Sequence, residues 1–356
     1  MIYTKSRYFF LSIIILSASF ADAKEEEKEQ TLQEEITEYI YHHVQDSHDF
    51  SFFSTKDKET GKKKYYGFPL PVILVDEGVK VFMSSKLDHG KKVVKASGKY
   101  YKLYHGKIYE TDSKGYISYD DEGNVTNAKP LDLSITKSVF SILLISLLMF
   151  WLFTSLAKSY RDNNQIASGI GRFFEPIVLL IRDEIAIPSI GEHHYKKYMS
   201  FLLTLFFFIW FLNLLGLSPL GVNVTGNIAV TFGLALITFL ITNLTANKTY
   251  WKHIFWMPGV PIWLKPLLAP IELLGVFIKP FSLMIRLYAN ILAGHIVLYS
   301  LIGLIFIFKN LVGSSLSLVL VFFISIIEVL VALLQAYIFT LLSALYFGFA
   351  VQEDDH

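Results

Sequence analysis

The chain has 356 residues, of which 53% are hydrophobic, and its mean hydropathy is +0.44. This hydropathy is well above that of a soluble globular protein, and the net charge of +1 gives no support for nucleic-acid binding. The absence of cysteine excludes disulfides, thiolate chemistry and cysteine-ligated metal. Charge is segregated along the chain: the stretch from Lys24 to Pro130 is polar, and the remainder is mostly long apolar runs.

Residues 1–23 have the pattern of a secretory signal peptide. Lys5 and Arg7 form a basic start, residues 8–17 an apolar core, and Ala21-Asp-Ala23 a cleavage site. The alternative is a first membrane helix, but about ten apolar residues are too few for the ~20 that a span requires. We therefore expect cleavage after Ala23 and export of the region that follows.

Residues 24–130 are expected to form a small exported α+β region. Lys24 to His48 reads as a charged helix. Short β-type runs follow, and His105-Gly106 fits a two-residue hairpin turn between the last two of them. These runs cover residues 72–75, 79–82, 99–104 and 107–111.

No catalytic constellation is evident in this region. His42, His43 and His48 are assigned to a solvated helix face rather than to a metal site. Asp120 to Asn124 reads as a solvated loop, because it lacks the ligand spacing of a calcium loop.

Residues 131–356 are predicted to form a mainly α-helical membrane domain with five segments. Each of the last two would measure roughly 60 Å as one helix, twice the ~30 Å hydrocarbon core. They must be bent or strongly tilted, and the short Lys309-Asn310 connection favours a tilted hairpin. Polar side chains along the third segment either serve helix packing or line a wet path. The segments cover residues 135–157, 198–217, 226–246, 267–308 and 314–351, and the polar side chains are Thr231, Thr238, Thr242 and Asn243.

Basic residues in the short connections predict the orientation. Six lie between Lys158 and Lys197 and three between residues 247 and 266, whereas the alternate connections hold only Lys309. Five crossings then place the mature N-terminus outside and the C-terminus in the cytoplasm. Residues 170–185 are expected to form an amphipathic helix on the cytoplasmic surface.

Arg286 is the most informative residue of the membrane domain. Its guanidinium keeps its charge at any biological pH, and placing it at bilayer depth costs about 2.5–3.5 kcal/mol on insertion scales. It must therefore meet a partner, a water-filled cavity or another subunit. Glu328 is the only charge in the last apolar run. A cation and a carboxylate on successive segments indicate ion movement.

Helical spacing predicts which side chains share a face. Successive residues turn by about 100°, so Glu272, Lys279 and Asn290 lie on one stripe with Arg286 if the helix continues past Pro280.

His295 points away from that stripe. Glu328 and Gln335 share a face of the last segment, which an antiparallel hairpin would bring beside His295. An imidazole and a desolvated carboxyl suit proton transfer, and Gln335 and Asn290 can hydrogen-bond water along such a route. The alternative is a buried polar cluster that only holds helices together, and intramembrane ionisable groups are functional by default. For Asn213 and Glu272 both interpretations stay open.

The run from Arg286 to His295, Arg-Leu-Tyr-Ala-Asn-Ile-Leu-Ala-Gly-His, resembles the signature of subunit a of F-type ATP synthases. Glu272, Lys279-Pro280 and the run from Glu328 through Gln335 to Phe339 also match that family. Asn213 to Pro219 and Asn223-Val-Thr225 look like its earlier hairpin, and Tyr39 to His43 its N-terminal helix. The resemblance covers residues 135 to the end and this short N-terminal stretch.

Two positions depart from the family pattern. Some relatives carry glutamate at position 295 and histidine at position 328, so His295 and Glu328 exchange the pair and keep one acid and one imidazole. Gly216 stands where some relatives have an acid, which implies that a charge at the channel mouth is missing.

The resemblance implies a non-catalytic stator subunit in the bacterial inner membrane. Arg286 would face the carboxylates of a rotor ring of c subunits and block leakage between two half-channels. The implied partners are that ring, the peripheral-stalk b subunits, the lipid bilayer, and protons rather than sodium ions. No cofactor, metal or nucleic acid is expected, and the lack of a P-loop leaves nucleotide binding to other subunits. The implied proton-channel residues are Asn213, Glu272, Asn290, His295, Glu328 and Gln335.

Two rival functions fit part of the sequence pattern. A self-contained ion-coupled secondary transporter would bind an anionic substrate at Arg286, but it predicts an inverted repeat that the sequence does not contain. A membrane-anchored exported binding protein would need only charge-free anchors, which leaves Arg286 and Glu328 without a reason.

Overall fold

The computed structural model describes residues 45–56, 63–162, 169, 171–218, 220–257, 259–308 and 310–352. The expected signal peptide, His42, His43 and most of the expected charged helix lie outside these residues. The described chain divides into two units, residues 296–324 and the remainder.

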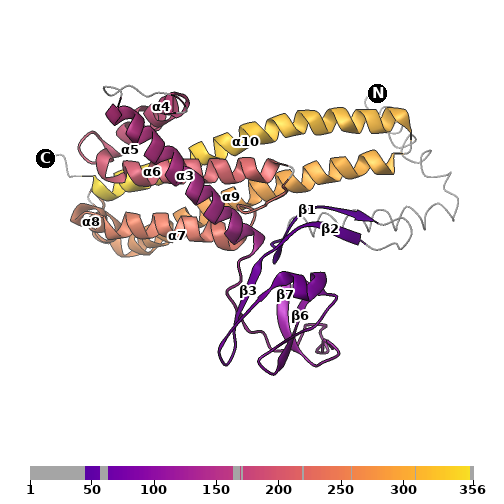
Figure 1. The fold of residues 1–356 in the computed structure, drawn as a ribbon. Coiled ribbons are helices and arrows are strands. Elements are labelled where there is room, and N and C mark those ends of the chain that lie inside the picture. Colours follow the sequence, from indigo (N-terminus) through magenta and orange to yellow (C-terminus); the bar gives the residue numbers. More distant parts are fainter. Residues whose placement is uncertain are drawn as a thin grey trace, which may run out of the picture. The chain divides into compact units, whose positions relative to one another are not determined.

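The polar region folds into three small antiparallel sheets within the described residues (Figure 1). Strand β1 (Asp49–Lys56) pairs with β2 (Lys63–Pro69). A second sheet has the order β4 (Val79–Met83), β3 (Pro71–Val75) and β8 (Leu131–Asp132). A third has the order β5 (Val94–Ala96), β6 (Lys99–Tyr104) and β7 (Lys107–Thr111), and a short helix η1 (Ser84–Gly90) follows β4.

The four predicted β runs are confirmed. Alternation buries Val72 and Leu74 of β3 completely, as a strand with one face on a core requires. His105 and Gly106 both have positive φ angles, 46° and 75°, which a two-residue turn between right-twisted strands needs. The β1–β2 hairpin was not predicted, because its sequence lacks a clear alternation of polar and apolar residues.

Asp76 stands at the centre of a network of paired charges. Its carboxylate accepts hydrogen bonds from Tyr101 Oη at 2.7 Å and from Lys99 Nζ at 3.1 Å, and Lys99 also pairs with Glu110. Hydrogen bonds from Tyr101 and then Lys99 lower the pKa of Asp76 to about 2, and the hydrogen bond to Asp76 raises the pKa of Lys99. The cations of this network are therefore satisfied within the chain.

The expectation that His48 lies on a solvated helix face is wrong. Residues 45–48 are not helical, and the His48 side chain is only 4% exposed. Its Nε2 lies 2.8 Å from Asp132 Oδ2, which joins the start of β1 to β8. A histidine paired with a distant acid cannot be recognised from local sequence.

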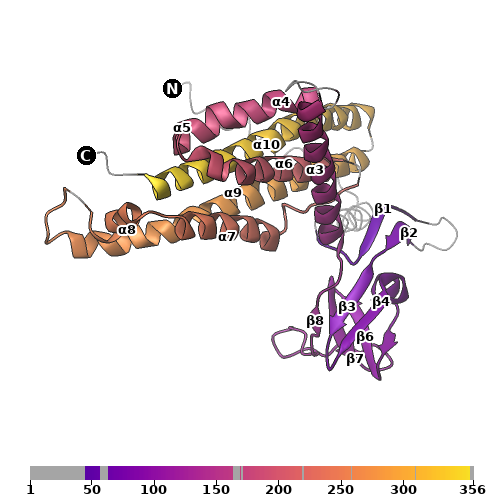
Figure 2. The ribbon, with the colours of Figure 1, turned by 60° about the vertical axis from the view of Figure 1, so that its left-hand side comes forward.

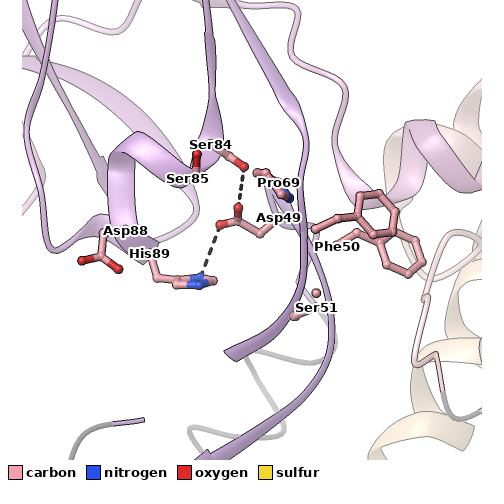
Figure 3. Close-up of a pocket in the computed structure, with 10 residues that line it drawn as sticks. Asp49, Phe50, Ser51, Pro69, Ser84, Ser85, Asp88 and His89 are labelled. Carbon is pink, nitrogen blue, oxygen red and sulfur yellow. Dashed lines mark hydrogen bonds and ion pairs between the residues drawn. The ribbon is translucent and has the colours of Figure 1, made fainter. Parts of the chain in front are cut away.

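Asp49 fixes β1 against η1, as Figure 3 shows. Its carboxylate accepts a hydrogen bond from Ser84 Oγ and lies 3.3 Å from His89 Nδ1. The next residue, Phe50, points to the other side of the strand. Strand β1 is thus held by the β region on one face and presents an aromatic ring on the other.

The remaining described residues are almost entirely helical. Four helices are long and apolar enough to cross a membrane, and α7 with α8 makes a fifth span if the two are counted together despite a 100° bend. The chain is therefore mainly α-helical with a small β region, as predicted. The helices are α3 (Lys137–Asp162), α4 (Gly171–Leu180), α5 (Ile187–Ile190), α6 (Tyr195–Leu217), α7 (Ile228–Leu244), α8 (Lys248–Phe255), α9 (Lys265–Ile307) and α10 (Leu311–Val351), with a π-helical turn η2 (Ile181–Ala186) between α4 and α5.

The third predicted span ends earlier than expected, at Leu244, and α8 was not predicted. The break has a physical cause in the packing of Asn247. Its backbone N–H donates to Ala350 O at 2.8 Å and its Nδ2 to Val351 O at 3.0 Å, where the last carbonyls of α10 lack helical partners. A distant helix end therefore sets the bend.

Helix α3 crosses α6 steeply, whereas α6 and the 325–351 part of α10 run in roughly one direction (Figure 2). Each of the two last helices is a single helix, 43 and 41 residues long. The long helices are therefore not folded back on themselves, and their tilt in the membrane stays a prediction.

The separate unit, residues 296–324, contains the turn between α9 and α10. Asn310 Oδ1 accepts a hydrogen bond from Gly313 N at 2.6 Å, and Ser314 Oγ donates to Ile305 O at 3.1 Å. The short connection is confirmed, although Lys309 itself lies outside the described residues.

Candidate functional site

Helix α9 carries the predicted polar stripe. It continues through Pro270 and Pro280 without a break, so the condition for a shared stripe is met. The stripe side chains are at least partly exposed, whereas Leu283 and Leu287 on the other side are buried. The stripe consists of Glu272, Lys279, Arg286 and Asn290.

Arg286 is half-buried and has no ion pair with any carboxylate of the described residues. A guanidinium with an in-chain partner would show a bidentate or close contact, as Arg182 does with Asp183 at 2.7 Å. The charge of Arg286 is therefore left for a group outside the described chain.

Asn290 connects the stripe to α10. Its Nδ2 donates to Gln335 Oε1 at 2.8 Å. Gln335 is buried, and among the described residues its Nε2 finds no hydrogen-bond partner. The amide therefore offers a donor to water or to a passing group.

Glu328 packs against α9 at Gly294. A Cβ added at Gly294 would collide with the Glu328 carboxylate, so the two helices approach closely only because this residue has no side chain. The Glu328 carboxylate therefore lies against the residue before His295. That Glu328 and His295 lie side by side stays a prediction.

His295 is 4% exposed and points toward α6. A Cβ at Gly216 would lie 3.3 Å from His295 Nε2 and 3.1 Å from Val222 O. The His295 imidazole therefore lies where an acidic side chain at position 216 would begin. The departures at positions 216 and 295 are thus spatially linked.

Asn213, one turn before Gly216, is 2% exposed. Its Oδ1 accepts a hydrogen bond from Thr225 Oγ1 at 2.7 Å, and its Nδ2 lies 3.4 Å from Ala332 O of α10. Asn213 therefore ties α6 to α10 and to the α6–α7 loop (residues 218–227, of which Pro219 is not described). Asn213, Thr225, Asn290, His295, Glu328 and Gln335 are called the His295 cluster below.

A second polar site lies toward the other end of α9. It is a small pocket between α7, α8, α9 and α10, with Asn243, Tyr250 and Lys279 among its lining residues. Asn243 Oδ1 is buried there without a hydrogen-bond partner in the described chain, and Glu272 interacts electrostatically with Tyr250. Lys279 Nζ lies 5.7 Å from the centre of the Tyr346 ring. This site is called the Tyr250 pocket, and its lining also includes Thr238, Phe239, Thr242, Val276, Pro280 and Phe349.

The threonines of α7 resolve part of the earlier alternative. Thr242 Oγ1 donates to Thr238 O at 2.8 Å, and Thr238 Oγ1 to Leu234 O at 3.1 Å. Such bonds to the preceding turn satisfy hydroxyls within a helix. Both residues nevertheless line the Tyr250 pocket. The polar face of α7 therefore borders this pocket in addition to its role in helix packing.

The sequence pattern names most residues of the His295 cluster but few of the Tyr250 pocket. Thr225 lies in the Asn223-Val-Thr225 run without a predicted role, and the pattern does not distinguish Tyr250 or Tyr346. Tyrosines occur throughout the chain, so only their proximity to Lys279 and Glu272 distinguishes these two.

Comparison with known proteins gives two family matches. Residues 139–348 match a family described as the ATP synthase A chain, and residues 39–133 match a domain of unknown function. The first match covers more than half of the chain.

Curated relatives agree with the first match. ATP synthase subunit a of Myxococcus xanthus is 44% identical over 237 residues, which is 64% of this chain and 77% of that protein. The subunit a of Chloroherpeton thalassium is 41% identical over 232 residues, or 63% and 69% of the two chains. ATP synthase subunit a 2 of Chlorobaculum tepidum is 42% identical over 232 residues, or 63% and 65%.

Proposed function

The chain belongs to the ATP synthase A chain family, and from this premise we propose that its two polar sites are half-channels that load and unload protons on a rotor carboxylate. It is a multi-pass membrane protein and a non-catalytic subunit of the synthase. The observation that carries the proposal is Arg286, which has no ion pair in the described chain and lies between the two sites along α9. At 1.5 Å per residue, His295 is roughly 14 Å from it along the helix axis and Lys279 roughly 10 Å.

The His295 cluster is proposed as the entry half-channel. It holds a carboxyl, an imidazole and three amides on α6, α9 and α10, where Asn290 bonds to Gln335, Glu328 lies against Gly294, and Asn213 reaches Ala332 O of α10. A proton entering from the periplasm passes Asn213, Glu328 and His295 and reaches the rotor near Gln335. The uncommitted Nε2 of Gln335 supports this end point, because it leaves a donor for water or for the rotor carboxylate.

The Tyr250 pocket is proposed as the exit half-channel. The unpartnered Asn243 Oδ1 supports a water there, because a buried acceptor without a protein partner is costly. Glu272, which acts electrostatically on Tyr250, then accepts the departing proton on the cytoplasmic side.

Arg286 has two roles in this mechanism. Its fixed charge stabilises the ionised form of a rotor carboxylate that passes between the half-channels, and it repels a proton that would cross directly. A proton falling through 100 mV releases about 2.3 kcal/mol, so several protons must be coupled to one ATP. A direct leak would dissipate that energy. Blocking the leak therefore offsets the free-energy cost of placing Arg286 in the membrane.

The partners and the orientation follow from the same proposal. The exposed apolar side chains of α9 and α10 suit a ring of c subunits, and the remaining surface suits lipid and the peripheral-stalk b subunits. Exposed examples are Ile285 at 45% and Leu330 at 62%. Basic connections put the mature N-terminus in the periplasm and the C-terminus in the cytoplasm of a bacterial inner membrane. Protons rather than sodium ions are the proposed cargo.

The experiment that tests the entry role is Glu328→Gln in membrane vesicles that contain the whole synthase. Passive proton flow should fall by about tenfold or more, because glutamine keeps the shape but cannot carry a proton. Glu184→Gln, at an exposed carboxylate of η2, is the control and should match wild type. Wild-type flow in the Glu328 variant would remove this residue from the pathway.

A further inference from the structure

We propose that the β region, a domain of unknown function by comparison, acts as a clamp that sets the shape of the α6–α7 loop at the entry half-channel, and that Lys137 is its positioning residue. This inference rests on the proposed entry half-channel, and it assigns a role to a domain that the core proton mechanism does not use.

Lys137 is a buried cation at the start of α3. Its side chain is 7% exposed, and its Nζ donates to Gly221 O at 3.0 Å. The ring of Phe50 lies beneath it, with Nζ 5.5 Å from the ring centre. Asp46 is the charged group that acts on it, without approaching to ion-pair distance in the described chain. A buried ammonium needs its hydrogen-bond acceptors, so the Gly221 carbonyl is held in place.

The β region fixes Lys137 from the other side. The backbone N–H of Lys137 donates to Ser47 O at 2.8 Å, and Ser138 N donates to Asp46 Oδ1 at 3.0 Å. The segment before β1 therefore caps the first turn of α3, whose N–H groups have no helical acceptors.

Three aromatic rings complete the junction. Phe50 stacks on Phe68 with ring centres 4.9 Å apart, and both rings meet Phe140 of α3 edge-on at 5.4 and 5.3 Å. Because Asp49 anchors the other face of β1 to Ser84 and His89, this junction cannot shift without the β region (Figure 3).

The loop carries this constraint to the proton pathway within five residues. Gly221 adopts a left-handed φ of 57°, and the next residue, Val222, is 1% exposed. The Val222 carbonyl rests against Gly216, beside His295 Nε2, and Thr225 Oγ1 donates to Asn213. Loss of the Lys137 hydrogen bond would free the loop at its tightest turn, and the Val222 and Thr225 contacts would loosen with it.

The test compares Lys137→Met, which keeps an apolar stem without the donor, with Lys137→Arg, which keeps a donor. We expect passive proton flow through the whole synthase to be about three- to tenfold slower in Lys137→Met, because a small misplacement of reacting groups is enough to slow transfer. Lys137→Arg should recover most of the rate. Lys129→Met is the matched control, since Lys129 also covers a ring of the β region, that of Tyr109, but is not among the loop contacts.

A second readout reports the loop itself. Because the chain has no cysteine, Val222→Cys places a single thiol in it. In the purified complex in nanodiscs, a polar maleimide should label this buried thiol slowly, and faster when Lys137→Met is added. A purely structural role for Lys137 in assembly would change the yield of complex but not the labelling or the flow per assembled complex.

The outcomes separate this inference from the proposed function. Slow flow in Glu328→Gln with normal flow in Lys137→Met overturns the clamp alone, as does faster labelling without slower flow. Normal flow in Glu328→Gln overturns the entry half-channel first.

If Lys137→Met does not assemble, Phe50→Leu removes part of the aromatic contact around Lys137 and should give a smaller change in proton flow and in labelling. Wild-type values for that variant then overturn the clamp.

Discussion

Cations of the β region and of the membrane domain are treated in opposite ways. Lys99 pairs with both Asp76 and Glu110 at the start of β6, where its side chain is partly exposed and water would have solvated it. Arg286 lies in an apolar helix, where a counter-charge matters far more, and has no ion pair with a carboxylate of the described chain. A solvent-accessible cation with ion pairs in its own chain has a structural role. A cation in an apolar helix without such a pair indicates a partner in another subunit.

Removing the unpaired cation should have the largest effect on transport. Arg286→Ala should lower ATP-driven proton pumping by about 100-fold or more, because the electrostatic stabilisation it supplies has no substitute nearby. Pumping is measured in inverted vesicles by quenching of a pH-sensitive dye. Arg182→Ala, at a paired and partly exposed arginine, should pump like wild type. Equal pumping by the two variants would mean that Arg286 has no special role in transport compared with the paired Arg182.

Crowding the His295 cluster should have a smaller effect. Gly294→Ala places a methyl group where the Glu328 carboxylate lies, so we expect passive proton flow to fall by about three- to tenfold. Gly275→Ala on the same helix meets nothing within 4 Å and is the control. If Gly294→Ala conducts normally, the close approach of α9 and α10 at Glu328 is not needed for conduction.

The Tyr250 pocket is tested by removing its unpartnered acceptor. Asn243→Leu should slow passive flow by about threefold, because a water held at Asn243 Oδ1 would lose that acceptor. Thr204→Val is the control, since Thr204 is exposed and its hydroxyl donates within its own helix, to Ser200 O. An unchanged rate in Asn243→Leu would place the exit elsewhere.

The paired network should affect acid stability and leave transport almost unchanged. The folded-state pKa of Asp76, about 2, lies below its ordinary value of 3.8, so the ionised carboxylate stabilises the fold above that value. This stability is lost as the pH falls from about 4 toward 2. Hydrogen exchange of β3 and β4 in the whole protein should show loss of protection in this window, relative to intrinsic exchange rates. Asp76→Asn should show less protection at pH 7 and a weaker change on acidification; an identical profile would mean that the network does not stabilise the sheet.

The sequence predicts the features that depend on neighbouring residues. Hydrophobic length gave the spans around α3, α6, α9 and α10, and alternation gave β3, β4, β6 and β7. The spacing of Arg286 and Asn290 placed both on one helix correctly.

Features that depend on distant partners could not be predicted. The bend after α7 depends on Asn247 reaching the end of α10, and burial of His48 depends on Asp132, which is 84 residues away in sequence. The exchange of acid and imidazole was visible in the sequence, but its link to Gly216 required the packing of α9 on α6.

The most direct test of Arg286 as the barrier between half-channels is passive proton flow with the rotor ring covalently cross-linked to the stator. In the otherwise wild-type complex the cross-link should stop flow, because protons can move only with rotation. In Arg286→Ala the cross-linked complex should still conduct, since protons would then pass directly between the His295 cluster and the Tyr250 pocket. A cross-linked Arg286→Ala complex that stays sealed would contradict the proposed role.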